Sequence, residues 1–503
     1  MEAKKANLFV HDVEIYPNYF CVTIKNRNTA KIVVFRIGKT DDVEFNDLLA
    51  ICAFYMDKGK WFIGYNSQHY DDRIISFLIE NKHILKGLTP LAIAKELKDF
   101  SDKIIVGGDT TTYTWDTRFN RLDMMRMGIR GNVPKALKLM AVNLKYPRIQ
   151  DLPFRVDRKI LHKDVKALEE YNLDDVEITN QLYDRFRGDV KLRKYISVKY
   201  GIDVMNDPDS SIADKLLTTI YSQRSRKTIL KLIPEHLGQI FLDILLELTE
   251  ERVAQKTKYK KTGDEQAYLE QKSLKITINS IFGKTGFEHG WLYDLQTMYS
   301  VTLNGQLFLL MLIEQLEMAG IHVFYANTDG LTADVPDTLR PIYDKICSDW
   351  QKYTGFKLDI DDKYKTCVIV NVNNYLIIKD NGETKAKGVL DHEAWKDVST
   401  KKSFDKPIVA YALYKYWVED VPIEQTIKNH TDLYDFCMAE KVGKTYDSVH
   451  FTTLDRKNFK EDIKKVQRTN RYFVTSNSHK GGGLGKVKYA HGTNPEKVTR
   501  ICA

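Results

Sequence analysis

The sequence predicts a mixed multidomain protein, with an α/β domain over residues 1–190 and an α+β remainder. A chain of 503 residues has room for about three or four domains of ordinary size. Strand and helix patterns alternate along the first 190 residues, whereas later helices lead into a hairpin pattern. The composition, 43% hydrophobic and 29% charged, is typical of a folded chain.

The first domain carries both element types in turn. Helical spacing over 163–187 places Leu168, Tyr171, Asp175 and Ile178 on related faces. The remaining patterns of this domain are strands over 8–13, 22–36 and 61–65 and a helix over 71–85.

The remainder begins with helices. A polar turn at 260–264 separates an apolar-striped helix from a second helix over 265–282, which predicts an antiparallel pair. A hairpin follows an apolar helix, with a turn signal at 327–330. The other expected elements are helices over 212–221 and 307–318 and strands over 321–326, 331–335, 364–372 and 375–379.

Charge and composition exclude several classes. The formal net charge is +8, and the stretch 441–503 holds fourteen Lys and Arg against five Asp and Glu. This tail is therefore expected to grip a polyanion. No apolar run approaches a membrane span, no apolar segment of a signal peptide follows the start, and the six cysteines form no Cys-x-x-Cys pair. We expect a cytoplasmic protein with reduced thiols and no membrane contact.

Several acidic residues of the first domain are spaced so that they share a face of a strand or helix with another candidate residue. Asp12 and Glu14 are two apart on a strand, so both carboxylates share one face. Crowded carboxylates suit Mg²⁺ or Mn²⁺, although two unrelated acids at a strand end would give the same pattern. Tyr171 and Asp175 are four apart on a helix, while Asp174 and Glu177 are expected to be surface charges.

A third group, Asn66, Tyr70 and Asp71, lies where a strand meets a helix. Either Asp71 or Asp72 could serve only as a helix N-cap. Together and in this order, the three groups resemble the exonuclease motifs of family B DNA polymerases. That resemblance implies an RNase H-like fold and 3′→5′ proofreading with two metal ions. It also implies the following roles: metal ligands Asp12, Glu14, Asp71 and Asp175, catalytic Tyr171, and DNA contacts from Asn66 and Tyr70.

The segment 275–283 is the most specific in the chain. Lys275, Asn279 and Gly283 form one helical stripe that could bind triphosphate, donate a hydrogen bond and leave room for a base pair. An ordinary helix with a solvated lysine is the alternative. The segment resembles a fingers motif of the same family, in which Arg252 would supply a second cation for the triphosphate.

The turn at 327–330 resembles another motif of that family, which holds a metal ion at a hairpin tip. Asp329 matches the catalytic ligand, whereas Asn327 replaces the first of two aspartates. A plain Asn/Asp/Gly turn is the alternative. Three further basic segments resemble family elements that contact DNA phosphates, and they contribute Lys385, Lys387, Arg468, Arg471 and Lys486.

One family motif is not found. The palm segment that supplies a second metal-binding aspartate has no counterpart in 191–272, and the junction of the flanking regions lies near 222–232. We expect that this segment is missing, either through a deletion or because it is omitted from the sequence, and that its absence puts polymerase activity in doubt. The conceivable substitutes are Asp203, Asp207, Asp209 and Asp214.

The resemblance implies a bacteriophage or prophage type of family B DNA polymerase in the cytoplasm of a bacterial host. It implies an exonuclease domain at 1–190, an incomplete palm at 191–232 and 288–392, fingers at 233–287 and a thumb at 393–503. The implied partners are primer–template DNA, single-stranded 3′ ends, dNTPs and phage replication proteins, bound by a monomer with two Mg²⁺ or Mn²⁺ ions per active site. The alternatives are an exonuclease alone and a non-catalytic DNA-binding protein.

Overall fold

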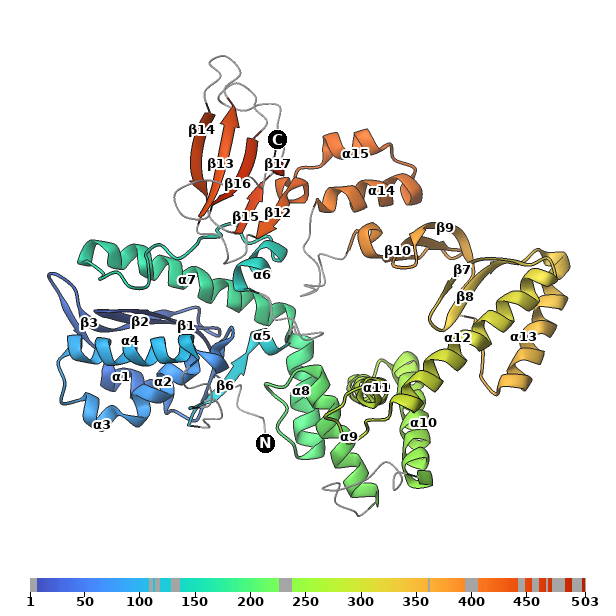
Figure 1. Ribbon diagram of the computed structural model, residues 1–503, viewed down its shortest axis with the longest axis horizontal. Helices are drawn as coiled ribbons and strands as arrows, with labels where there is room; N and C mark the ends of the chain where they lie inside the picture. Colours follow the sequence, from blue (N-terminus) through green and yellow to red (C-terminus); the bar gives the residue numbers. More distant parts are fainter. Residues whose placement is uncertain are drawn as a thin grey trace.

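The elements follow one another around an open ring in the computed structural model, from a blue N-terminal sheet to red C-terminal strands (Figure 1). Strands and helices are mixed throughout, as expected for a multidomain chain of this class. The structure describes residues 7–107, 112–113, 118–127, 136–225, 238–360, 362–393, 406–441, 448–454, 461–466, 469–472, 485–490 and 500–502. Within these residues, no helix combines the length and apolar character needed to cross a bilayer.

A six-stranded mixed sheet forms the N-terminal part, with the order β4-β3-β2-β1-β5-β6. β1 pairs antiparallel with β2 and parallel with β5, so it lies near the centre of the sheet. The strands are β1 (Asn7–Tyr16), β2 (Tyr19–Asn26), β3 (Ile32–Lys39), β4 (Glu44–Asn46), β5 (Lys60–Gly64) and β6 (Asn120–Asp123).

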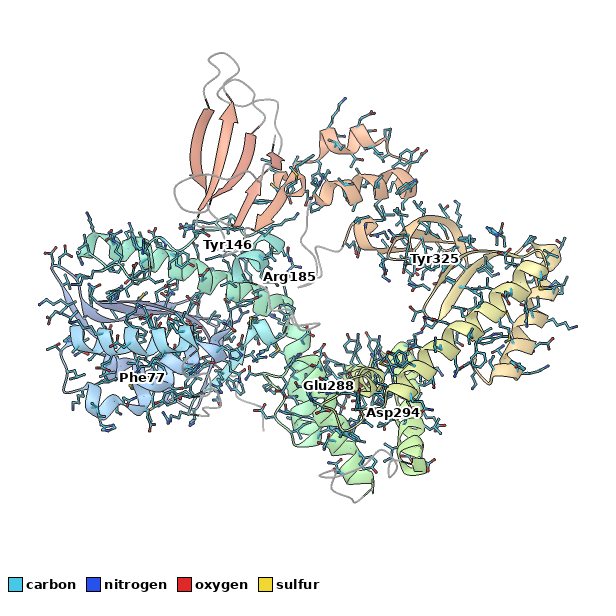
Figure 2. The ribbon with its side chains drawn as sticks, in the orientation of Figure 1. Phe77, Tyr146, Arg185, Glu288, Asp294 and Tyr325 are labelled. Atoms are coloured by element: carbon cyan, nitrogen blue, oxygen red, sulfur yellow. The ribbon has the colours of Figure 1, made fainter. Side chains whose placement is uncertain are left out.

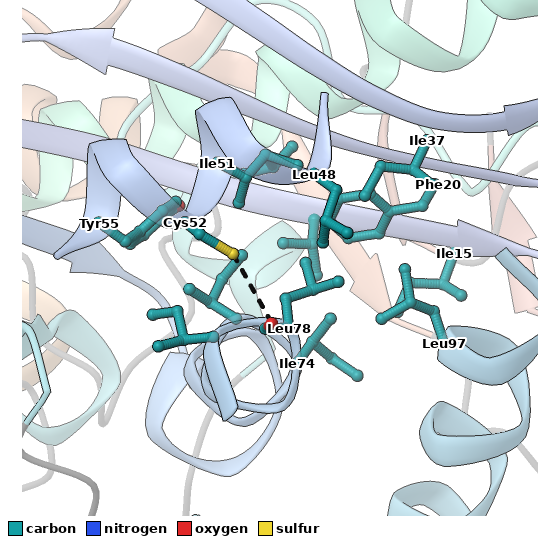
Figure 3. Packing of buried hydrophobic residues seen from close by; sticks show 14 of the residues in the cluster. Ile15, Phe20, Ile37, Leu48, Ile51, Cys52, Tyr55, Ile74, Leu78 and Leu97 are labelled. Carbon is teal, nitrogen blue, oxygen red and sulfur yellow. Dashed lines mark hydrogen bonds between the residues drawn. The ribbon is translucent and has the colours of Figure 1, made fainter. Parts of the chain in front are cut away.

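Helices cover both faces of this sheet. The odd residues of β1, such as Val13 and Ile15, pack with α1, α2 and α4, and Figure 3 shows this core, including the hydrogen bond from Cys52 Sγ to the Leu78 carbonyl. The even residues Val10 and Tyr16 pack against α7. The helices of this part are α1 (Leu48–Tyr55), α2 (Asp71–Glu80), α3 (Lys82–Leu85), α4 (Pro90–Val106), α5 (Met124–Met127), α6 (Leu137–Asn143), α7 (His162–Arg185) and the 3₁₀ turn η1 (Ser67–His69).

Two expected elements are divided. The strand expected over 22–36 is two strands, because Asn26 Oδ1 accepts the backbone N–H groups of Asn28 and Thr29 and closes a turn. The helix expected over 71–85 breaks at Asn81, whose side chain donates to the Phe77 carbonyl. In both places an asparagine side chain competes with regular backbone pairing.

A helical region follows, and it contains the expected antiparallel pair. Asp264 caps the second helix of the pair by accepting from the N–H groups of Gln266 and Ala267. The buried Glu270 accepts from the Tyr195 hydroxyl and so joins the pair to α8. The helices are α8 (Arg187–Tyr200), α9 (Asp209–Ser225), α10 (Gly238–Thr262) and α11 (Glu265–Thr285).

The hairpin region lies beyond this helical region. A two-stranded sheet, β7 (His322–Asn327) with β8 (Gly330–Asp334), packs with α12 (Leu295–Met318) and α13 (Arg340–Thr354) around Leu316 and Trp350. Figure 2 shows Tyr325 on this hairpin, and its hydroxyl donates to the Val372 carbonyl. A three-stranded sheet follows, built from β9 (Tyr364–Asn371), β10 (Asn374–Lys379) and β11 (Thr384–Lys387), with 3₁₀ turns η3 (Asp337–Leu339) and η4 (Gly388–Leu390).

The C-terminal part contacts the N-terminal part through an ion-pair group centred on Lys145. Lys145, which has a positive φ of 54°, places Nζ 2.7 Å from an Asp432 oxygen and 2.6 Å from an Asp435 oxygen. We call this contact the Lys145 clasp. The C-terminal elements are α14 (Pro407–Glu419), α15 (Ile423–Asn429), η5 (Leu433–Phe436), β12 (Met438–Lys441), β13 (Ser448–Leu454), β14 (Glu461–Val466), β15 (Thr469–Tyr472), β16 (Gly485–Ala490) and β17 (Arg500–Cys502).

Candidate functional site

Three carboxylates meet between β1 and α7. Asp12, Glu14 and Asp175 each offer a ligand atom, and these atoms all lie within 4.8 Å of one another. Asp175 is buried, whereas Asp12 and Glu14 are partly exposed, so the group opens to solvent on one side. We call these three residues the acidic cluster.

The sheet and α7 hold the acidic cluster in place. Residues two apart on β1 share a face, so Asp12 and Glu14 both point toward α7. The buried Asn172 on α7 donates from Nδ2 to Asp12 Oδ2 at 2.6 Å, and its Oδ1 accepts the Thr23 N–H at 3.1 Å. This amide therefore ties one ligand to both the helix and the neighbouring strand.

Asp71 approaches the acidic cluster from α2. The pairing of β5 with β1 ends at Val10, and the Val13 N–H beyond it donates to Asp71 Oδ1 at 3.1 Å. Asp71 and Asp72 lie in the first turn of α2, which has no side-chain N-cap bond. The carboxylate of Asp71 thus caps the free edge of β1 rather than the end of its own helix.

Burial and mutual repulsion perturb these acids. Burial raises the pKa of Asp12 well above its ordinary value, and the charges of Asp71, Asp175 and Glu14 raise it further. Burial and the same neighbours also raise the pKa of Glu14, and burial raises the pKa of Asp71 to about 7. Four acids in one place favour a bound cation, because a cation offsets the repulsion that each added negative charge creates.

Lys138 supplies a positive charge at this place. Its Nζ forms an ion pair with Asp175 and lies 4.2 Å from the centre of the Tyr171 ring. The charge of Lys138 lowers the pKa of Asp175, which burial raises overall. No sequence pattern indicates this lysine, because it reaches the acidic cluster from α6 through tertiary contact alone.

Three other residues expected in the exonuclease site, Tyr171, Tyr70 and Asn66, each have different contacts. Tyr171 is buried and hydrogen-bonds Asp175, and burial raises the pKa of its hydroxyl. The Tyr70 hydroxyl lies 2.7 Å from Ser101 Oγ, and Asn66 adopts a left-handed φ of 59° before α2.

Asp174 differs from the surface charge that the sequence suggests. It is buried, and it accepts hydrogen bonds from Tyr146, which is labelled in Figure 2, and from Arg148. The paired cation and hydroxyl compensate its burial.

The chemistry of the donor set fits a divalent metal ion. Carboxylate oxygens are hard ligands that Mg²⁺ and Mn²⁺ prefer, and the acidic cluster supplies several within the span of one coordination sphere. Asp71 is not one of the three residues whose ligand atoms meet within 4.8 Å, but its charge raises the pKa values of Asp12 and Glu14.

The fingers-like stripe is exposed on α11. Lys275, Asn279 and Gly283 are all exposed, and a Cβ built on Gly283 would meet no atom within 4 Å. Partial burial lowers the pKa of Lys275, and the charges of Lys272, Arg252 and Lys256 lower it further. Arg252 on α10 therefore faces the same region as Lys275, and the joint positive charge suits an anion.

Asp329 is exposed at the tip of the β7–β8 hairpin. Its N–H donates to the Asn327 carbonyl at 2.6 Å, across Thr328 with its positive φ of 49°. Asn327 donates from Nδ2 to the Tyr325 hydroxyl at 3.3 Å. Among the described residues, the acidic cluster is the one group of three acidic, His or Cys side chains that meets, and Asp329 does not belong to it.

The conceivable substitute carboxylates are engaged with other groups. Asp207 pairs with Lys215, Asp209 with Arg193 and Asp214 with Lys284, while Asp203 accepts the Met205 N–H. Each of these four aspartates therefore has a partner within the helical region of α8 to α11 or the loop before α9.

The residues expected to contact DNA are partly described. Lys385 and Lys387 lie on β11, and Lys387 Nζ lies 6.0 Å from the Tyr375 ring centre. The backbones of Arg471 and Lys486 lie on β15 and β16. Arg468, residues 226–232 of the expected junction and the glycine-rich stretch 481–484 lie outside the described residues.

Comparison with known proteins relates part of the chain to one class. Residues 205–399 match the family model for DNA polymerase family B, a segment that includes the α11 stripe and Asp329. The acidic cluster lies before this segment. The chain is therefore related at low identity to family B DNA polymerases.

Individual relatives come from archaea. A DNA polymerase of Thermococcus sp. (strain 9oN-7) is 30% identical over 168 residues, which are 31% of this chain and 22% of that protein. DNA polymerase 1 of Aeropyrum pernix is 28% identical over 141 residues, which are 27% of this chain and 14% of that protein. The matched parts thus span less than a quarter of these relatives. A solved family B DNA polymerase from Pyrobaculum calidifontis aligns with 99% of this chain and 74% of its own, at 15% identity and a TM-score of 0.47.

Proposed function

We propose that this protein is a metal-dependent 3′→5′ DNA exonuclease joined to a family B polymerase region. The observation that carries the proposal is the acidic cluster, whose ligand atoms lie within 4.8 Å of one another. The order of the three acidic motifs along the sequence supports the exonuclease assignment, and an RNase H-like domain at 1–190 belongs to the same proposal.

Asp12, Glu14, Asp175 and Asp71 would hold two Mg²⁺ or Mn²⁺ ions. Such ions, when bound, activate a water molecule and stabilise the leaving 3′ oxygen. Asn172 orients Asp12 through its 2.6 Å hydrogen bond, and Tyr171 is placed beside Asp175 to orient the attacking water. Lys138 offsets part of the negative charge around Asp175.

The test is shortening of a 5′-labelled primer–template in Mg²⁺ without dNTPs. The wild type should remove nucleotides from the 3′ end, and Asp12→Ala with Glu14→Ala should abolish shortening while leaving DNA affinity nearly unchanged. Asp42→Ala with Glu44→Ala is the matched control, because both side chains are exposed in the same domain. Shortening by the Asp12/Glu14 variant at the wild-type rate would place the nuclease site elsewhere.

Template-directed synthesis is the second proposed activity. The family match over 205–399 favours it, since this segment holds Lys275, Asn279, Gly283 and Asp329. Lys275 and Arg252 would steady the triphosphate of a dNTP, and Asp329 would hold metal. Two ions need more than one carboxylate, so we expect extension by dNTPs to be weak or absent.

A missing palm segment between 222 and 232 is part of this proposal. The β7–β8 sheet has two strands, and residues 299–307 of α12 are exposed, including Tyr299, Val301, Leu303 and Leu307. An apolar helix end with this exposure has room for a further packed element. Sequencing the source DNA across the junction tests the proposal. An uninterrupted reading frame with no added codons would support the absence of the segment, and added codons would contradict it.

The proposed setting is replication of bacteriophage DNA in a bacterial host, with primer–template DNA as substrate. The basic tail over 441–503 would grip duplex DNA as a thumb, together with Lys385 and Lys387. Binding through this tail should weaken steeply with added salt in a gel-shift titration, because phosphate contacts release counterions. A flat salt response would assign DNA binding to another surface.

A further inference from the structure

A buried polar pair lies on the opposite face of β1 from the acidic cluster. His11 and Asp72 are both buried, and His11 Nε2 lies 3.5 Å from Asp72 Oδ1. Each residue is next in sequence to a proposed metal ligand, since Asp12 follows His11 and Asp71 precedes Asp72. We call His11 and Asp72 the rear pair.

The alternation of β1 places the rear pair in the core beneath the sheet. Odd residues of β1 face α1 and α2, so His11 points away from Asp12 and Glu14. His11 Nδ1 lies 2.8 Å from the Tyr55 hydroxyl on α1. Asp72 Oδ2 accepts from Ser67 Oγ at 3.1 Å in the turn before α2. The rear pair thus connects β1 to both the first turn of α2 and the turn before it.

The two facing atoms have no alternative partners in the described part of the chain. His11 Nε2 and Asp72 Oδ1 are both buried, and neither forms a hydrogen bond there, so their 3.5 Å approach is a polar contact that falls short of a hydrogen bond. Moving the helix away from the strand would separate these two buried polar atoms and cost the attraction between them. This cost opposes sliding or rotation of α2 relative to β1.

The surrounding backbone leaves little room for adjustment. Gly64 ends β5, and a Cβ built on it would lie 2.3 Å from Ser67 Cβ and 3.2 Å from His11 Nε2. Glycine is therefore required for the sheet end to approach the rear pair this closely. The packing fixes His11 and the turn that holds Asp72 at the same time.

We propose that His11 and Asp72 are positioning residues, which set the separation between the β1 ligands and the α2 ligand of the metal site. The proposal rests on the metal site of the proposed exonuclease. Two contacts then join the start of α2 to β1: Asp71 with the Val13 N–H on the edge of the strand, and Asp72 with His11 beneath it. Apolar packing already holds α2 against the sheet, and the second polar contact adds a fixed direction, so its loss would let Asp71 shift relative to Asp12 and Glu14.

Loss of either member of the rear pair should weaken metal binding, while substitutions of similar volume keep the core packed. Residues that orient metal ligands typically contribute 10–100-fold to metal affinity or activity. We therefore expect His11→Leu and Asp72→Asn each to weaken Mn²⁺ binding by about 10–100-fold. The double variant should be no weaker than the worse single variant, because both substitutions break one contact.

The experiment measures Mn²⁺ bound to the full chain by electron paramagnetic resonance of the free ion, with thermal unfolding of each variant alongside. Leu78→Ala is the matched control, because Leu78 is fully buried in α2 and in the same core. It should lower the unfolding temperature as much as either rear-pair variant, yet keep Mn²⁺ affinity within about twofold. His11→Gln should restore part of the affinity lost in His11→Leu, since its amide can donate toward Asp72. Asp72→Asn and His11→Gln keep the test available if His11→Leu does not fold.

The outcomes separate this inference from the proposed function. Wild-type Mn²⁺ affinity in both Asp72→Asn and His11→Leu, or an equal loss in Leu78→Ala, would overturn the positioning role. Mn²⁺ binding that depends on the rear pair, in a wild-type protein that shortens no DNA, would support the positioning role and overturn the exonuclease. A wild-type chain that binds no Mn²⁺ would overturn both.

Discussion

The acidic cluster on β1 and α7 and the hairpin carboxylate Asp329 differ in their surroundings. Asp12, Glu14 and Asp175 converge from two elements and are held by Asn172 and Lys138. Asp329 stands exposed at a hairpin tip, with no second acid among the described residues that meets it in a group of three. A residue can therefore match a family motif without having other carboxylates beside it, and carboxylates can converge outside the matched segment. The family match covers Asp329, whereas the assembled carboxylates lie outside it.

The largest expected effect contrasts one carboxylate from each region. Asp175→Ala should slow shortening of labelled DNA by roughly 10³-fold or more, because one of the assembled ligands is lost. Asp329→Ala should leave shortening unchanged, and dNTP-dependent extension is measured in the same reactions. A large loss of shortening in Asp329→Ala would mean that the two regions share one site.

The second prediction concerns pH in metal-free protein. Burial raises the pKa of Asp71 from 3.8 to about 7, so the folded protein binds more protons than the unfolded chain between those values. The free energy of unfolding should therefore rise as the pH falls from 7 to 4, by at most about 1.4 kcal/mol per pH unit for this group.

Urea unfolding in EDTA at several pH values measures this effect, and Asp71→Asn is the control that should make the slope shallower, with Asp12 and Glu14 supplying the remainder. Added Mg²⁺ should also reduce the slope, since a cation favours the ionised carboxylates. An identical slope in wild type and Asp71→Asn would assign the pH dependence to other groups.

Lys138→Met probes the charge balance of the acidic cluster. Without its ion pair, Asp175 is buried beside other acids with less compensation, and the free energy of unfolding in EDTA should fall by about 2–4 kcal/mol. Saturating Mg²⁺ should recover most of this loss. Lys25→Met, which breaks the pair with Glu177 farther along α7, should show no such recovery by metal.

The smallest expected effect belongs to the exposed stripe on α11. Lys275→Ala should weaken binding of a fluorescent dNTP by roughly tenfold, as expected for one charge-assisted contact. Lys284→Ala on the same helix is the control, because Lys284 pairs with Asp214. Equal binding by wild type and Lys275→Ala would remove the nucleotide role from this stripe.

Local periodicity predicted much of the fold and the shared faces of the acidic residues, but not that β1 and α7 would meet. The two-residue spacing of Asp12 and Glu14 and the four-residue spacing of Tyr171 and Asp175 correctly placed these side chains on shared faces. The helix pair joined by the turn before Asp264 is also confirmed.

Residues that act through tertiary contact escaped prediction. Lys138, Asn172 and His11 meet their partners across at least 37 positions in the chain, so no local spacing indicates the contact. Asp174 was wrongly expected at the surface because helical spacing alone does not reveal that Tyr146 and Arg148 cover it. Asn26 and Asn81 divided two expected elements through side-chain bonds to the backbone.

The Lys145 clasp has a consequence for synthesis of the chain. Lys145 and Asp432 are 287 positions apart, so a ribosome adding about 5–20 residues per second needs about 15–60 seconds between them. The sheet and α7 that flank Lys145 are complete by Arg185 and can fold during this delay. The part of the chain through Arg185 can therefore fold well before Lys145 meets Asp432 and Asp435.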